Sequence, residues 1–126
     1  MSQFGIACLV GLGGAIGALA RYGASRAAAA KKKPGFYATL AVNLAGSFLM
    51  GLFIGCRLES GHAVLYAFAG TGILGGLTTY STLNVQKASL LRSGAKRTLL
   101  YYVAATYAVG FGLTALGVAI GDMMLT

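Results

Sequence analysis

Four long runs of apolar residues, joined by short linkers, constrain this chain more than any other feature of its sequence. The runs cover about residues 4–29, 36–56, 63–91 and 97–121. An α-helix needs about 20 apolar residues to cross the hydrocarbon core of a bilayer, and each run is long enough or nearly so. With 57% hydrophobic residues and only two acidic ones, the chain cannot cover a water-facing surface with charge. We therefore predict a single all-α domain over residues 1–126, whose four helices cross a membrane and contact its lipid.

Small residues recur four positions apart within these runs. The pairs are Gly13 and Gly17, Gly51 and Gly55, Gly72 and Gly76, and Gly117 and Gly121. Such a pair leaves a flat patch on one face of a helix, which lets another helix approach closely. Two interpretations remain open: the patches pack helices together within one subunit, or they form an interface between subunits.

The basic residues gather beside two of the three linkers. Beside the first linker lie Arg21, Arg26, Lys31, Lys32 and Lys33, and beside the third lie Lys87, Arg92, Lys96 and Arg97. Cytoplasmic loops of membrane proteins are rich in Lys and Arg, so we predict one orientation in the plasma membrane, with the first and third linkers in the cytoplasm and both termini outside. A topology bias of this kind explains the net charge of +8 without a nucleic-acid partner.

The third run contains the sequence GGLTTYST at residues 75–82, which is unusual for a membrane helix. Each glycine weakens a helix by about 1 kcal/mol, and irregular backbone persists in a membrane only where protein or a water-filled cavity satisfies its polar groups. We predict a break in the third helix, where freed carbonyls can coordinate a cation and freed amides and hydroxyls can donate to an anion. The alternative is a continuous helix whose Ser and Thr side chains bond back to their own carbonyls.

Asn43 is a polar side chain in the middle of the second run. Because an amide in lipid is unfavourable unless it is bonded, Asn43 is expected either to join helices or to contact a solute. Glu59 and Asp122 lie only at the edges of the runs, so a proton relay inside the membrane is absent from the sequence pattern. The sequence also lacks metal-ligand spacing and a nucleophile beside a base, and we predict that the chain is not an enzyme.

Three segments together resemble the fluoride channels called Fluc or CrcB: GAIGALARY at residues 14–22, TLAVNLAG at 39–46 and GILGGLTTYST at 72–82. The third segment is the most specific. The resemblance implies an antiparallel dimer that passes fluoride passively out of the cytoplasm and so lowers intracellular fluoride. It also implies a structural Na⁺ at the dimer centre, held by the backbone carbonyls of Gly75 and Thr78.

The resemblance further implies a fluoride path lined mainly by uncharged polar residues. Its residues would be Asn43, Tyr80, Ser81, Thr82, Leu83, Tyr102 and Thr106. Hydroxyls, amides and the positive edges of aromatic rings can replace the water around fluoride without holding the ion too tightly to release it. The family usually has Phe at the positions of Tyr80 and Leu83, and often Glu at that of Gln86, so this chain departs from the pattern at the path itself.

The charge bias and Leu83 together suggest a heterodimer. A chain that inserts in one orientation cannot form an antiparallel pair with itself, so we expect a homologous subunit of opposite orientation as its partner. Two other interpretations remain. A small multidrug-type exporter would need a carboxylate inside the first run, and none is present. The second interpretation is a non-conducting subunit that supports its partner's pore, and Leu83 favours it.

Overall fold

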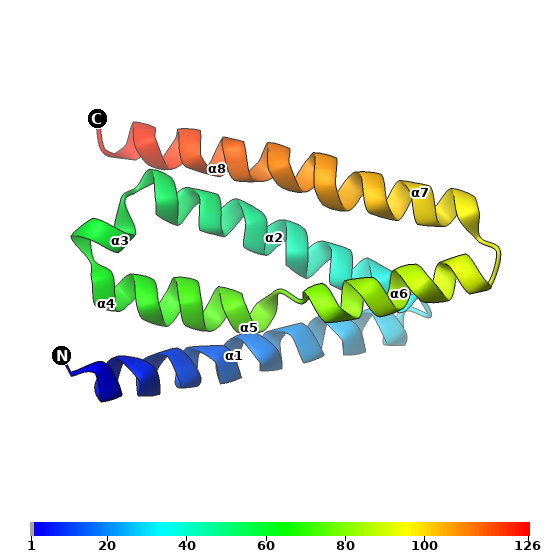
Figure 1. The fold of residues 1–126 in the computed structure, drawn as a ribbon, viewed down its shortest axis with the longest axis horizontal. Helices are drawn as coiled ribbons and strands as arrows, with labels where there is room; N and C mark the ends of the chain where they lie inside the picture. The colour runs from blue at the N-terminus through cyan, green and yellow to red at the C-terminus, as the bar shows by residue number, and fades with distance from the viewer. Residues whose placement is uncertain (1) are drawn as a thin grey trace.

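The chain runs back and forth through four long helical segments (Figure 1). The structure, a computed structural model, describes residues 2–126, and four of its helices are long and apolar enough to cross a membrane. The first two segments are single helices, α1 (Gln3–Ala30) and α2 (Gly35–Gly55). The prediction of an all-α chain with four membrane helices is confirmed, and residues 2–126 form no β-strand.

The third and fourth segments are each divided into several helical pieces. The short helix α3 (Leu58–Gly61) leads into the third segment, which comprises α4 (Ala63–Leu65), η1 (Tyr66–Leu74), α5 (Gly75–Leu77) and α6 (Tyr80–Arg92). The fourth segment comprises α7 (Lys96–Ala104), η2 (Ala105–Val109) and α8 (Gly110–Met124). The pieces η1 and η2 are π-helical, a wider winding that is rare and often occurs at functional sites.

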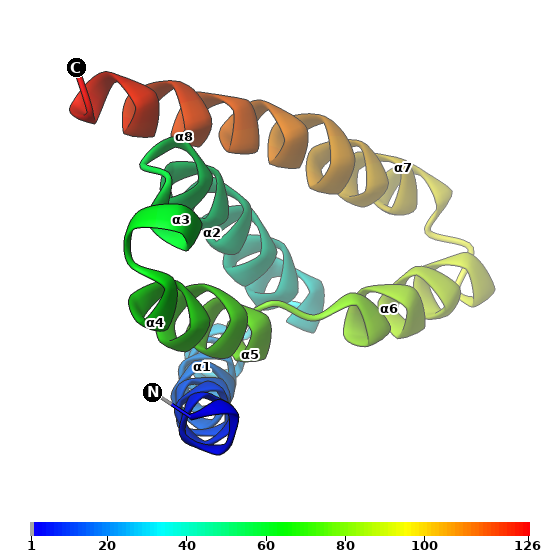
Figure 2. The ribbon, with the colours of Figure 1, turned by 60° about the vertical axis from the view of Figure 1, so that its left-hand side comes forward.

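The glycine pairs pack the helices together within the subunit. A methyl group on Gly17 of α1 would overlap the Ile73 carbonyl of the third segment, and one on Gly76 would overlap the Gly14 carbonyl. Figure 2 shows the resulting pairing, with α1 beneath α4 and α5, and α2 beside α8. Of the two interpretations of these pairs, the structure supports packing inside the subunit.

The same close approach joins the second and fourth segments. A methyl group on Gly51 of α2 would overlap the Thr114 carbonyl of α8, and one on Gly117 would overlap the Phe48 carbonyl. Backbone that lies against backbone leaves no side chain to rearrange, so these contacts have little tolerance for added volume. The chain therefore consists of two tightly joined helix pairs, and α6 and α7 diverge from them at one end (Figure 2).

Most of the basic residues lie toward one end of the molecule, whereas Arg57, in the second linker, lies at the other. The first linker, after α1, and the third linker, between α6 and α7, both lie at the end opposite to the two termini and the second linker (Figure 1). Lys33 lies over the ring of Tyr37 at this end, 5.7 Å from its centroid. The fold thus places at one end of the molecule the two linkers whose charges predict a common side of the membrane.

We expect Gly51→Ala to destabilise the protein, because its methyl group would overlap the backbone of Thr114. Overpacking of this kind typically lowers the free energy of unfolding by about 1–3 kcal/mol. Gly112→Ala in α8 is the matched control, since a methyl group there meets nothing within 4 Å. Thermal unfolding in detergent measures both variants, and equal melting temperatures would contradict the packing role of Gly51.

Candidate functional site

The third segment loses its helical geometry at Thr78 and Thr79, which we call the break. Both residues are extended, with φ −81° and ψ 154° at Thr78 and φ −149° and ψ 121° at Thr79. The helix α5 ends just before them at Leu77, and α6 begins just after them at Tyr80. Thr79 also caps α6, because its Oγ1 accepts a hydrogen bond from the Thr82 N–H at 3.3 Å.

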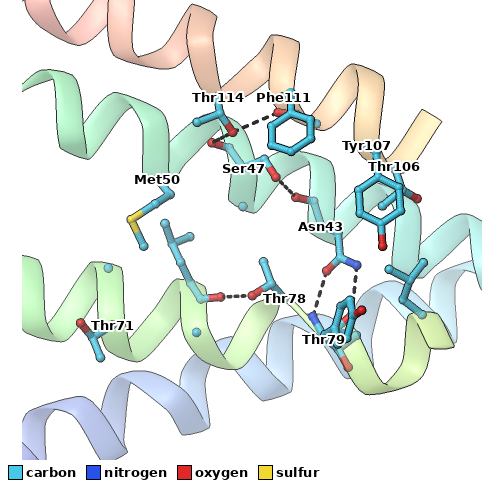
Figure 3. A pocket seen from close by; sticks show the side chains of 17 residues that line it. Asn43, Ser47, Met50, Thr71, Thr78, Thr79, Thr106, Tyr107, Phe111 and Thr114 are labelled. Carbon is cyan, nitrogen blue, oxygen red and sulfur yellow. Dashed lines mark hydrogen bonds between the residues drawn. The ribbon is translucent and has the colours of Figure 1, made fainter. Parts of the chain in front are cut away.

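Asn43 of α2 binds the break through both ends of its side-chain amide (Figure 3). Its Oδ1 accepts from the Thr79 N–H at 2.9 Å, and its Nδ2 donates to the Thr79 carbonyl at 3.1 Å. These bonds replace the partners that a continuous helix would give Thr79, and such replacement is required of irregular backbone in a membrane. Asn43 thus joins helices, and the second hydrogen on Nδ2 is still available to a solute.

The break deprives several carbonyls of their helical donors, among them those of Gly75 and Thr78. In a continuous helix, the Thr79 N–H would donate to Gly75 and the Thr82 N–H would donate to Thr78. Here the Thr79 N–H donates to Asn43 and the Thr82 N–H donates to the Thr79 side chain. The carbonyls of Gly75 and Thr78 are therefore free to bind another partner.

A groove with a volume of about 570 Å³ runs beside the break, between α2 and the third and fourth segments (Figure 3). Its polar lining residues are Asn43, Ser47, Thr71, Thr78, Thr79, Tyr80, Thr106, Tyr107 and Thr114. No residue that lines it carries a charge. Because one water occupies about 30 Å³ of liquid, the groove has room for on the order of 20 waters, far more than a dehydrated ion needs.

Most of the predicted site residues line this groove, and three do not. Those that line it are Asn43, Gly75, Thr78, Tyr80, Leu83 and Thr106. Ser81 and Thr82 lie in the first turn of α6 and do not line the groove. Tyr102 of α7 does not line it either. Leu83 is only 3% exposed, so it forms part of the apolar wall of the groove, whereas Tyr80 is 67% exposed.

Four hydroxyls beside the groove already donate to main-chain carbonyls of the preceding helical turn. The Ser47 hydroxyl donates to the Asn43 carbonyl at 2.8 Å, and that of Thr78 to the Leu74 carbonyl at 2.9 Å. The Thr106 hydroxyl donates to the Tyr102 carbonyl at 2.7 Å, and that of Thr114 to the Gly110 carbonyl at 3.0 Å. Bonding back to the helix is therefore the observed state of these hydroxyls, including that of Thr78 in the GGLTTYST sequence. A hydroxyl has a single hydrogen, so in this state each presents only lone pairs to the groove.

Free hydroxyl hydrogens gather instead at the start of α6. Thr82 accepts a hydrogen bond from the Thr79 hydroxyl at 2.9 Å, which leaves its own hydrogen available. The neighbouring Tyr80 side chain is exposed and also carries a hydroxyl. The Ser81 hydroxyl lies 3.5 Å from that of Thr79 and is the donor in this long contact, because the single Thr79 hydrogen already goes to Thr82. An anion beside the break would therefore meet its donors mainly in this turn.

Tyr102 is held in a different environment, at the basic end of the molecule. Its hydroxyl donates to Gln86 Oε1 at 2.8 Å, and its ring lies 5.3 Å from that of Phe36. Only 2% of its surface is exposed, so its hydroxyl is engaged with a neighbour rather than open to the groove.

Several lining residues are absent from the sequence-based prediction. They are Ser47, Thr71, Tyr107, Phe111 and Thr114. The fourth segment lacks a recognisable motif, which is why only Tyr102 and Thr106 of it entered the prediction and Tyr107, Phe111 and Thr114 did not. The spacing of Thr106, Gly110 and Thr114, four apart, offers one indication, because residues at this spacing share a helix face.

Comparison with known proteins places the chain in a family. The family described as CrcB-like protein, Camphor Resistance (CrcB), matches residues 8–118. The chain belongs to the CrcB family. This confirms the resemblance seen in the sequence and, with the four apolar helices, makes the chain a multi-pass membrane protein.

Individual relatives match along nearly their whole length. The chain is 40% identical over 118 residues to the fluoride-specific ion channel FluC 2 of Lactobacillus delbrueckii subsp. bulgaricus, covering 91% of this chain and 97% of that protein. It is 40% identical over 121 residues to the fluoride-specific ion channel FluC of Thermus thermophilus, covering 93% and 95%. FluC 1 of Listeria monocytogenes serotype 4b is also 40% identical, over 114 residues, covering 90% and 94%. The names of these relatives describe channels and not enzymes.

We expect Asn43→Leu to destabilise the protein by about 2 kcal/mol, because it leaves the N–H and carbonyl of Thr79 without partners. Asn84→Leu is the matched control, since Asn84 is exposed on α6. Thermal unfolding of both variants in detergent measures the difference. An Asn43→Leu variant as stable as the control would show that the amide does not hold the break.

Proposed function

We propose that this chain is a subunit of a fluoride-specific ion channel that passes fluoride passively out of the cytoplasm and lowers its intracellular concentration. The observation that carries the proposal is the groove beside the break, which has many polar side chains and no charged one. The CrcB family and the FluC relatives support the identity of the ion.

The ion path is proposed to begin with the donors around the break. The hydroxyls of Tyr80, Ser81 and Thr82 and the second Nδ2 hydrogen of Asn43 would replace part of the water around fluoride. Neutral donors match a conducting pore, because a site must bind its ion well enough to admit it and weakly enough to release it. The proposed path then continues past Thr106, whose hydroxyl would have to turn from the Tyr102 carbonyl to meet the ion.

The break is also a suitable place for a structural sodium ion. Na⁺ is a small, hard cation that binds oxygen, and the Gly75 and Thr78 carbonyls have lost their helical donors. These two carbonyls would contribute this subunit's share of the site. The ion would supply a fixed positive charge beside an anion path that has none of its own.

A second subunit is proposed to close the groove. In the isolated chain the groove is open and has a volume of about 570 Å³, far more than a dehydrated ion needs, so another protein surface has to enclose the path. The basic linkers favour one orientation, with their end in the cytoplasm and the termini outside, and an antiparallel pair then needs a related chain of opposite orientation. A heterodimer meets both requirements, and relatives named FluC 1 and FluC 2 fit such an arrangement.

The exporter alternative has no support in the groove, whose lining contains no carboxylate to exchange protons. A non-conducting subunit remains the second candidate, because Leu83 is nearly buried and offers no ring edge to an anion. In that case the chain would complete its partner's pore without containing a working path of its own.

We expect the complex with an oppositely oriented CrcB-family subunit, reconstituted into liposomes, to release fluoride and to retain chloride. A fluoride-selective electrode records the efflux, with empty liposomes and each subunit alone as controls. The chain alone is expected to release little fluoride, because its groove stays open. Robust efflux from the lone chain would refute the need for a different partner. Absence of fluoride efflux from the complex and from the lone chain would refute the channel function.

We expect Leu83→Phe in the same complex to raise fluoride efflux at least about twofold, since it places an aromatic edge beside the path. Leu91→Phe is the control, because Leu91 is 58% exposed and lies outside the groove. If neither substitution changes the efflux, the path beside Leu83 does not conduct and the supporting role is favoured.

A further inference from the structure

Arg21 lies deep within the first membrane segment, apart from the basic cluster that Lys31, Lys32 and Lys33 form at the end of α1. It sits on α1, about 13 Å before the end of the helix at about 1.5 Å per residue. With 28 residues, α1 is about 42 Å long and extends roughly 6 Å beyond each side of a centred 30 Å hydrocarbon core. The backbone of Arg21 therefore lies about 7 Å inside the edge of the hydrocarbon core, where a guanidinium requires a partner.

The side chain of Arg21 turns toward the middle of the membrane. Helical side chains tilt toward the N-terminus of their helix, which for α1 is the end opposite to the basic cluster. Its Nε–H donates to the carbonyl of Gly76 at 3.2 Å, in a part-buried contact. The guanidinium thus binds backbone just before the break instead of extending to the cytoplasmic end.

Glycine packing brings Arg21 to this carbonyl. Gly13, Gly17 and Arg21 are spaced four apart and lie on one face of α1. The two glycines press that face against the backbone of the third segment, and Gly17 meets Leu77 at the end of α5. One turn further along, the same face places Arg21 beside Gly76.

The carbonyl of Gly76 needs this partner because of the break. In a continuous helix it would accept from the N–H of Tyr80, and the extended Thr78 and Thr79 move that donor away. Arg21 supplies the missing hydrogen bond with a charged donor, which is stronger than a neutral one. Asn43 fixes the break at Thr79 and Arg21 fixes it at Gly76, so it is held from α2 and from α1.

We infer that Arg21 is a positioning residue for the break: its hydrogen bond to Gly76 fixes the end of α5, so that the neighbouring carbonyls of Gly75 and Thr78 keep their places. The role of those carbonyls toward a cation rests on the proposed function. The positioning itself does not, since it concerns contacts within this chain alone.

Hydrogen exchange tests the inference on the purified chain in detergent, without fluoride or sodium. The reporter is the peptide containing the Thr79 amide, which is protected by its bond to Asn43. We compare Arg21→Met with Arg21→Lys, which keeps a charged donor, and with Arg26→Met, which removes an exposed arginine from the same helix. Peptides around Gly51 and Gly117 report on the rest of the fold.

We expect Arg21→Met to speed exchange at residues 77–80 about tenfold, the effect of losing one charged hydrogen bond. Arg21→Lys is expected to restore most of the protection, and Arg26→Met to match the unmodified chain. Unchanged exchange in Arg21→Met would overturn the inference. Faster exchange throughout the chain would overturn it as well, because Arg21 would then support the whole fold and not the break. Since no fluoride transport is measured, failure here is distinguishable from failure of the channel function.

Discussion

The side-chain amide of Asn43 and the backbone of Thr79 form the interaction on which the site depends. In lipid, an N–H or carbonyl without a partner has no water to bind, so a helix can be interrupted only where protein groups replace its internal bonds. Asn43 provides one donor and one acceptor to the same residue, as a neighbouring peptide group would. With those bonds made, two residues of the third segment can remain extended, and everything beside them follows: a capped α6, free carbonyls at Gly75 and Thr78, and donors aligned in one helical turn.

The helix packing explains why this interruption is held in one place. Glycines along α1 and α2 bring backbone against backbone, α1 with the third segment and α2 with the fourth. Contacts of this type do not slide or repack easily, because no flexible side chain separates the helices. The break lies between the two pairs, where α2 reaches it through Asn43 and α1 reaches it through Arg21.

The sequence predicted the fold well because its determinants are local. Apolar run length predicted the four membrane helices, and the first and third linkers lie at one end of the molecule, as four alternating spans require. The site was less accessible to sequence reasoning. Ser47 and Thr114 sit in ordinary helical sequence, and only the pairing of α2 with α8 reveals that they face a common groove. The choice between two roles for Asn43 also required the fold, since its partner Thr79 lies 36 residues away.

The hydroxyls that bond back to their own helices give the groove an uneven polarity. Around Ser47, Thr106 and Thr114 the wall offers oxygen lone pairs, while the start of α6 offers hydrogens. A negative ion on the proposed path along this wall would reverse the local dipoles as it advanced, because each hydroxyl would have to leave its carbonyl to face the ion and return once the ion had passed. Rotations of exposed side chains occur within picoseconds to nanoseconds. On the proposed path, selectivity would have an energetic origin, because only an anion that binds hydroxyl hydrogens strongly would offset the loss of each hydroxyl–carbonyl bond.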